Sequence, residues 1–377
     1  MMRVPLAWRN VVHERSRAAV GIAGVAFAIM LIFLQLGFFN SVIISANQYY
    51  DELDYDLVIV SREYSFIRSP QSFPRRRLFQ AMSLTEVVSA EPLYMGTVTW
   101  QNPQTGNRNA TLVFGFDPDR PVFRTPSIQA HLTSLKVPDT AIVDSETRPK
   151  YGNRKPGTAI ELGGRNIAII DEYKLGTSFL ELGIILTSDH NFRRMLPRLS
   201  LDDVGIGLVK IRPGTDQIAV VHALRKLMPS DVNVWSRDEF RNHEVHHWLV
   251  ATSTGFIFGS GVVVAILVGL VILYQTISTQ IMTKMNEYAT LKAIGYQSRQ
   301  IFRVVVEQAC FIALLGFLPG LIAALGLYAA VQMAVFLPMV MTWQRIFTVI
   351  LLTIGMAVGS GWLAFRKVQA ADPADLF

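Results

Sequence analysis

Four long stretches of the chain contain no Asp, Glu, Lys or Arg, and they constrain its fold more than any other feature. They cover residues 18–50, 248–283, 308–344 and 346–365. Each has at least 20 residues, which is about the number that a helix needs to cross a hydrocarbon core of roughly 30 Å. The sequence therefore predicts four membrane-spanning helices.

The first two stretches are longer than one membrane crossing requires. A helix over Trp248–Thr283 would be about 50 Å long, so about 20 Å would extend beyond the hydrocarbon core. A tilted or frayed helix would also absorb this excess. Because both excesses lie beside the long segment that separates the two spans, we favour a pair of stalks that carry that segment outside the membrane.

Basic residues in the short flanks predict the orientation. They are Arg3, Arg9, Arg15 and Arg17 before the first span, Lys284, Lys292, Arg299 and Arg303 between the second and third, and Arg366 and Lys367 after the fourth. Such residues favour the cytoplasmic side, so we expect both termini and the 284–307 segment there. The segment from Asp51 to Glu244 has 24 basic and 24 acidic residues, so the formal net charge of +6 comes from the flanks. It indicates topology rather than nucleic-acid binding.

The predicted fold class is a membrane α-helical protein, with four transmembrane helices arranged one plus three and a large mixed α/β extracytoplasmic domain between helices one and two. The expected segments are a cytoplasmic amphipathic lead-in (1–17), helix 1 and stalk (18–50), the outer domain (51–241), stalk and helix 2 (242–283), a cytoplasmic loop (284–307), helix 3 (308–337), an external turn (338–345), helix 4 (346–365) and a cytoplasmic tail (366–377). The only cysteine, Cys310, lies in helix 3, so we expect no disulfide in the outer domain.

Alternating strand and helix signals predict the α/β character of the outer domain. Strands are expected at Leu57–Val60, Thr97–Gln101, Thr111–Phe116, Ala159–Leu162, Asn166–Ile170, Val204–Ile211 and Val232–Val234. Gly163-Gly164 predicts a hairpin turn, and apolar spacing predicts a helix over Asp216–Met228. The strand–helix–strand order favours small α/β subdomains.

Two polar runs in this domain have alternative interpretations. His243-Glu244-Val245-His246-His247 matches H-E-x-x-H, the zinc-protease pattern, but no acid, His or Cys follows before Glu287 to supply a third ligand. We therefore expect no metal and favour a polar helix face beside Trp248. Arg75-Arg76-Arg77 is expected to be a solvated loop, with docking to a partner or to anionic headgroups as the alternative.

Other signatures of catalysis or of ion coupling are missing from the sequence. It has no G-x-x-x-x-G-K-[ST] phosphate loop and no G-x-S-x-G. The four uncharged stretches also lack His, whereas ion-coupled transporters generally need ionisable groups near the bilayer centre. Three G-x-x-x-G pairs, Gly255/Gly259, Gly316/Gly320 and Gly355/Gly359, favour a tight bundle or a dimer. If this protein moves a cargo, we expect a partner to supply the energy.

The cytoplasmic segment after Lys284 predicts two helices separated by a glycine. Met285, Tyr288, Leu291 and Ile294 repeat every third residue, which gives one apolar stripe before Gly295. A second helix is expected to start near Ser298 and to lead into the third span. The stripe would lie either in the membrane interface or in a groove on a cytoplasmic partner.

Residues of this segment carry a family resemblance. Glu287-Tyr-Ala-Thr-Leu-Lys-Ala-Ile-Gly295, followed by Arg299-Gln-Ile-Phe-Arg303 and Glu307, resembles the E-x-A-x-L-R-A-x-G-x-x-x-x-x-I…E signature of MacB/FtsX/LolC-type ABC transporter permeases. The N-terminal Leu6-Ala7-Trp8-Arg9-Asn10 and the C-terminal Asp372-Pro373-Ala374-Asp375-Leu376 resemble the two ends of that family, although Asp375 replaces an alanine. The run 140–145 and the hairpin 157–176 are most similar to DevC-type exporter permeases.

The resemblance implies partners and a mechanism. Two copies of the chain would pair with two copies of a separate ATPase that binds ATP and Mg, so this chain would be non-catalytic and hold no cofactor. The 284–297 region would be the coupling helix, with Glu287, Tyr288, Leu291, Lys292, Ile294 and Gly295 as the expected ATPase-coupling residues. The outer domain would work with a periplasmic membrane-fusion adaptor and an outer-membrane channel on an amphiphilic or glycolipid cargo, at the bacterial inner membrane.

Two other functions stay as alternatives at this point. An FtsX-like signalling permease would activate a periplasmic cell-wall hydrolase without moving cargo. A zinc membrane protease would use His243 and His247.

Overall fold

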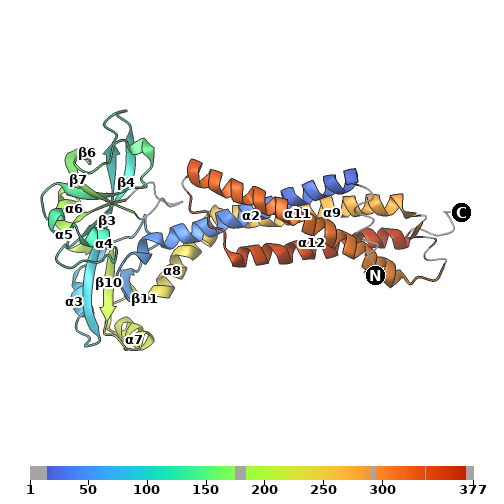
Figure 1. Cartoon of the computed structure of the whole chain (residues 1–377). Helices are drawn as coiled ribbons and strands as arrows, with labels where there is room; N and C mark the ends of the chain where they lie inside the picture. Colours follow the sequence, from blue (N-terminus) through green and yellow to red (C-terminus); the bar gives the residue numbers. More distant parts are fainter. Residues whose placement is uncertain are drawn as a thin grey trace. The chain divides into compact units, whose positions relative to one another are not determined.

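The structure is a computed structural model that describes residues 15–174, 184–285, 287, 288, 290, 294–335 and 337–370. The chain divides into two compact units (Figure 1). The helical unit comprises the chain up to Ser41 and from Thr254 onward, and the α/β unit comprises Val42–Ser253. The predicted lead-in around Trp8 and the C-terminal Asp372–Leu376 motif lie outside the described residues.

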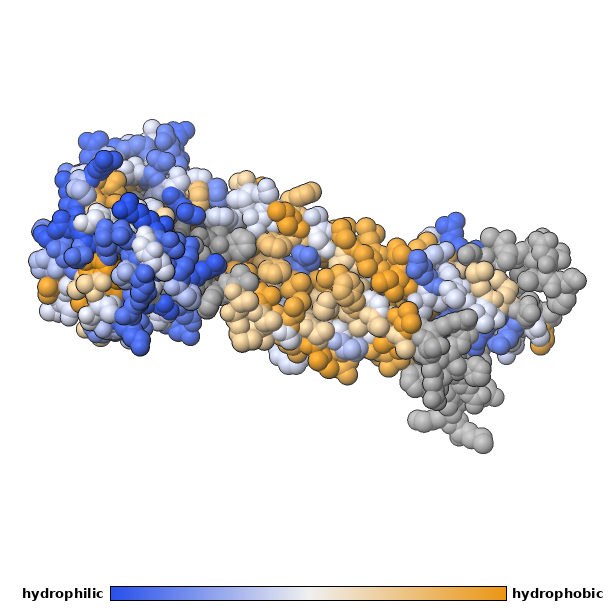
Figure 2. Space-filling view, turned by 90° about the horizontal axis from the view of Figure 1, so that it is seen from above, coloured by the Kyte–Doolittle hydropathy of each residue, from blue (hydrophilic) through white to orange (hydrophobic). Residues whose placement is uncertain are grey.

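Four long helices dominate the helical unit. They are α2 (Arg15–Asp51, which continues into the α/β unit from Val42), α9 (Ser253–Thr283), α11 (Ser298–Val335) and α12 (Trp343–Ala370). By length and composition, all four could cross a membrane. Figure 2 shows hydrophobic surface over these helices. The predicted fold class, four apolar helices with a large α/β domain between the first two, is confirmed.

The second apolar stretch is not one continuous helix. Helix α8 (Arg237–His246) runs into a π-helical turn η2 (His247–Ala251), and Thr252 is extended before α9 begins. The Thr252 hydroxyl donates to the Trp248 carbonyl at 2.6 Å, a local bond that competes with the helix ladder. The expected uninterrupted helix over Trp248–Thr283 is therefore wrong at its start.

Nine strands of the described residues form one sheet in the α/β unit. Their order is β11-β1-β10-β3-β4-β8-β5-β7-β6. The bounds are β1 Leu57–Ser61, β3 Val87–Gln101, β4 Arg108–Phe116, β5 Thr140–Asp144, β6 Ala159–Leu162, β7 Arg165–Tyr173, β8 Ile184–Ser188, β10 Ile206–Ile211 and β11 Val232–Ser236. Two short strands, β2 (Phe73–Pro74) and β9 (Asp203–Val204), pair separately.

The long strand β3 joins two parts of this sheet. Its first half pairs with β10 up to Leu93, and its second half pairs with β4 from Tyr94. Trp100 of β3 also pairs with Leu162 of β6, so strands β3-β4-β8-β5-β7-β6 close on themselves. We call these six strands the closed lobe, and β11-β1-β10 with the first half of β3 the open lobe. The two lobes share β3, so the expected small α/β subdomains are parts of one nine-stranded sheet.

Apolar side chains fill the closed lobe and both faces of the open lobe. Trp100, Val113, Val143, Ile169 and Ile185 lie in one buried cluster. That cluster continues in the open lobe under α3 (Arg76–Ala81) and α7 (Gln217–Leu227). The alternate residues of the open lobe belong to a second cluster with Phe240 of α8, as expected when successive strand residues point to opposite faces. Two further short helices, α4 (Pro126–Gln129) and α5 (Leu132–Leu135), contribute to this second cluster, whereas α6 (Asp189–Met195) packs on the first.

Candidate functional site

The predicted coupling segment has helical hydrogen bonds where the structure describes it. The Tyr288 N–H donates to the Lys284 carbonyl at 3.1 Å, and the Ile294 N–H donates to the Thr290 carbonyl at 3.0 Å. Gly295 has φ +103°, a conformation that other residues rarely adopt. The backbone conformation of Gly295 explains why the predicted helix ends there. Helix α11 begins at Ser298, where the second helix was expected.

The side chains of this segment face different surroundings. Tyr288 is only 5% exposed, and burial, with a smaller contribution from Glu287, raises its pKa to about 12. Ile294 is 71% exposed and Glu287 is also exposed, whereas Leu291 and Lys292 lie outside the described residues. The role of these residues in coupling stays a prediction, and Ile294 is more accessible than Tyr288, the other apolar coupling residue that the structure describes.

The three predicted glycine pairs pack in different ways. A Cβ on Gly320 would lie 2.7 Å from the Ala26 carbonyl oxygen of α2, and one on Gly316 would lie 2.9 Å from Val25. A Cβ on Gly259 or Gly355 would meet nothing within 4 Å. For Gly359 the nearest atom would be at 3.7 Å, and Gly255 is half-buried. Only the Gly316/Gly320 pair is in close helix contact within one chain.

Sequence spacing missed other close-packed glycines on α2 and α9. A Cβ on Gly21 would lie 2.5 Å from Thr276, one on Gly24 would lie 2.7 Å from Ile272, and one on Gly269 would lie 2.8 Å from Met356. Gly21 and Gly24 are separated by three positions rather than four. The G-x-x-x-G pattern therefore does not include Gly21 and Gly24, although a G-x-x-G spacing also places two small residues on one helix face.

Polar side chains also join the helices. Gln308 of α11 donates to Gln280 of α9, and both are buried. At the start of α12, Arg345 is only 8% exposed. Its guanidinium donates to the Val340 carbonyl at 2.5 Å and to the Tyr328 hydroxyl at 3.2 Å. The single basic residue of the predicted external turn is therefore folded back onto α11.

The H-E-x-x-H sequence does not present a metal-binding face. Glu244 is fully buried, and its carboxylate accepts hydrogen bonds from Tyr64 and Tyr50. His243 lies 3.0 Å from the Ser65 carbonyl oxygen, and its ring stacks on Trp235. His247 stacks on Phe66 at a centroid distance of 4.4 Å. Among the described residues, no three His, Cys, Asp or Glu side chains are grouped to hold a metal ion.

The arginine run is only partly a solvated loop. Arg76 is exposed, but the Arg77 side chain is 9% exposed and its Nη2 lies 2.7 Å from the Asp231 carboxylate. The expectation of a solvated run is therefore wrong for Arg77, which joins α3 to the segment before β11.

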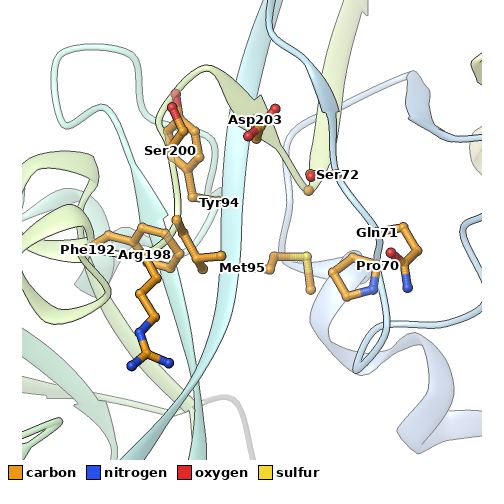
Figure 3. A pocket seen from close by; sticks show the side chains of 11 residues that line it. Pro70, Gln71, Ser72, Tyr94, Met95, Phe192, Arg198, Ser200 and Asp203 are labelled. Atoms are coloured by element: carbon orange, nitrogen blue, oxygen red, sulfur yellow. The ribbon is translucent and has the colours of Figure 1, made fainter.

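A groove of about 270 Å³ opens where the two lobes meet (Figure 3). Tyr94 and Met95 lie on opposite sides of β3 and form part of its wall with Phe192 of α6, and Arg198 and Asp203 lie apart from one another along it. Gln71, on its rim, has φ +47°, which is uncommon outside glycine. Apolar and polar side chains line the groove in about equal measure, which suits an amphiphilic ligand or a partner segment.

The C-terminal helices are similar to a known protein family. The family model described as FtsX-like permease C-terminal matches residues 259–373. These residues are similar to the C-terminal part of FtsX-like permeases. They include most of α9, all of α11 and α12, and the segment that carries the sequence resemblance. The predicted MacB/FtsX-type superfamily is thereby confirmed, whereas the DevC-type assignment stays a prediction.

Two solved structures similar to this chain are a periplasmic region and an extracellular domain of other proteins. The periplasmic region of MacB from Actinobacillus actinomycetemcomitans is 10% identical, with a TM-score of 0.37 over 51% of this chain and 94% of that one. The extracellular domain of the noncanonic ABC-type transporter YknZ from Gram-positive bacteria is 14% identical, with a TM-score of 0.33 over 48% of this chain and 99% of that one. No curated protein matches the chain.

Proposed function

We propose that this FtsX-like permease is the membrane subunit of an ABC exporter and that it transmits force from a separate ATPase to its α/β unit. The observation that carries this proposal is the FtsX-like domain over residues 259–373. A partner as the energy source fits the sequence, which has no G-x-x-x-x-G-K-[ST] phosphate loop and no Asp, Glu, Lys, Arg or His in its four apolar stretches. The chain is accordingly non-catalytic.

The two chain connections between the units suit different mechanical roles. Helix α2 is continuous from Arg15 to Asp51, and its Tyr49 and Tyr50 are buried in the core of the α/β unit. A displacement of α2 would therefore move that core directly. The second connection is interrupted at Thr252, so it can bend. We assign α2 as the lever and the 247–252 segment as the joint.

The proposed assembly contains two copies of this chain and two copies of the ATPase. Closure of the ATPase on ATP would act on residues 284–297, and the α/β unit would act on a periplasmic adaptor that leads to an outer-membrane channel. An amphiphilic or glycolipid cargo fits the mixed apolar and polar lining of the groove at Met95 and Arg198. The setting would be a bacterial inner membrane with both termini in the cytoplasm.

Co-purification of the full chain from native membranes tests this proposal. An ATPase should accompany the wild-type chain, and Ile294→Asp should abolish its recovery, because this change puts a charge on the proposed docking surface. Ile218→Asp is a matched control, since Ile218 is 70% exposed and Ile294 is 71% exposed, but Ile218 lies on α7. If no ATPase accompanies the wild-type chain, the proposal is wrong.

The other proteins recovered distinguish export from signalling. An adaptor together with an outer-membrane channel would support export. A cell-wall hydrolase in their place would support an FtsX-like signalling permease. If Ile294→Asp retains the ATPase, the coupling segment is wrongly placed even where the family assignment holds.

A further inference from the structure

The contact between α8 and the segment that follows β1 contains a buried carboxylate. Glu244 of α8 is 0% exposed. Its Oε1 accepts from the Tyr64 hydroxyl and, at 3.4 Å, from the Tyr50 hydroxyl, while the two hydroxyls are 2.8 Å apart. No side chain among the described residues donates to its Oε2. These partners are neutral, and a buried charge is costly where no cation compensates it.

Aromatic rings keep water away from this carboxylate. The Phe240 ring is fully buried, with its centroid 4.5 Å from the Tyr50 ring and 5.6 Å from the Tyr64 ring. Just past the end of α8, His247 of η2 stacks on Phe66. The 64–67 segment is thus attached to α8 on both sides of Glu244, and α8 continues into the joint at 247–252.

We propose that Glu244 is a proton-operated latch, which holds α8 on the 64–67 segment when it is neutral and loosens this contact when it is charged. The latch itself is a property of the α/β unit. Its use as a sensor of the outside medium rests on the proposed function, which puts this unit outside the cytoplasm. Release of α8 would free the start of the joint, so acidity would stiffen the second connection between the units.

The direction of the pH effect follows from burial. Desolvation raises the pKa of Glu244 to about 7, against opposing hydrogen bonds from Tyr64, the Ile67 amide and Tyr50. Because the pKa in the folded state lies above the ordinary value of 4.5, the folded chain retains a proton between these two pH values. The stabilisation is complete below the ordinary pKa and is lost as the pH rises through 7.

Other titratable groups lie near Glu244, and their contribution to a pH dependence must be distinguished from that of Glu244. Tyr50 on α2, Tyr55 before β1 and Tyr64 after β1 face it or interact with it electrostatically. Burial raises the pKa of Tyr55 to about 12 and that of Tyr64 well above its usual value, so neither titrates near pH 7. His243, on α8 itself, lies against Tyr64 and needs its own variant.

Hydrogen exchange of the full chain in detergent micelles tests the latch without any partner. Exchange rates, normalised to intrinsic amide rates, should show residues 237–251 and 61–69 more protected at pH 5.5 than at pH 8. The change between these two pH values is at most roughly 30-fold, because opening lowers the pKa from about 7 to 4.5 and part of that effect is already present at pH 5.5. Glu244→Gln, which is neutral at every pH, should remove this dependence, whereas Glu63→Gln at an exposed position of the same segment should keep it.

Two outcomes would overturn the latch. One is equal normalised protection of the wild-type chain at both pH values. The other is a Glu244→Gln chain that keeps the pH dependence, and loss of the dependence in His243→Asn would then assign it to the histidine. Should Glu244→Gln fail to fold, Tyr64→Phe serves instead. It removes a hydrogen bond to the charged form and should move the midpoint to higher pH, and an unmoved midpoint would contradict the latch.

Discussion

The arginines at 75–77 show how identical neighbours differ once partners distant in sequence are in place. Arg77 donates from Nε and Nη2 to Asp231, which is 154 positions away, and from Nη1 to Gln80. Arg76 is exposed. A single sequence cannot reveal such a pair, because nothing local to either residue requires it. The same holds for Glu244, whose hydrogen-bond donors Tyr50 and Tyr64 are 194 and 180 positions away.

Substitution of the arginine run should have effects that differ by position. Arg77→Met should destabilise the α/β unit by about 1–3 kcal/mol, the range for hydrogen bonds to a charged group. Asp231 stays 41% exposed, so water limits the loss. Arg76→Met, the control, should change stability by less than about 0.5 kcal/mol. Urea unfolding followed by tryptophan fluorescence measures both, and equal effects would contradict the assigned ion pair.

At the scale of elements, the sequence predicts the turns, helix starts and strands that depend on neighbouring residues. The hairpin at Gly163-Gly164 is present between β6 and β7. Helix α7 starts after Asp216, whose carboxylate accepts from the Ile218 N–H at 3.0 Å. Strands β1, β4 and β11 also lie where β-branched runs predict them. In each of these, the residues that decide the structure are neighbours in sequence.

The closed lobe could not be predicted in this way. It depends on parallel pairing of β4 with β8 and of β5 with β7, and on the contact of β3 with β6. Strands β5 and β8 are buried along their whole length, so they have no alternation to mark them as strands. Closure is set by long-range pairing, which short sequence periods do not report.

The glycine pairs give a prediction for the helices. Gly320→Ala should destabilise the helical unit, because the new Cβ would lie 2.7 Å from the Ala26 carbonyl oxygen, a backbone atom that cannot move aside cheaply. Gly355→Ala meets nothing within 4 Å, and alanine is favoured over glycine in a helix by up to about 1 kcal/mol. Thermal unfolding in detergent should therefore rank Gly355→Ala at or above wild type and Gly320→Ala below it.

The Gly355 variant also bears on the predicted dimer. If Gly355 and Gly359 form a contact between two copies, Gly355→Ala should weaken self-association while leaving the fold of each chain intact. Crosslinking in membranes measures this. An unchanged dimer would place the interface elsewhere, and a destabilised monomer would contradict the open surface at Gly355.

At the scale of the whole molecule, the four apolar helices with an α/β domain between the first two are the feature that the sequence predicts best. A spanning helix must satisfy its own backbone and remain apolar over about 20 residues, so its signal is continuous and local. The orientation depends only on the flanking Lys and Arg. Which side chains are buried in the α/β unit, and which glycines pack closely in the helical unit, could not be predicted, because both depend on residues that are far apart in the sequence.

The predicted orientation can be tested with the one native cysteine removed. In a Cys310→Ala background, Val88→Cys and Ile294→Cys place thiols at side chains that are 63% and 71% exposed in the α/β and helical units. With spheroplasts and a membrane-impermeant maleimide, Val88→Cys should be labelled at once, and Ile294→Cys only after lysis. Because both sites are similarly exposed, a difference in labelling reports the side of the membrane rather than burial. Labelling of Ile294→Cys in intact spheroplasts would put the 284–307 segment outside and remove the cytoplasmic docking site on which the coupling proposal depends.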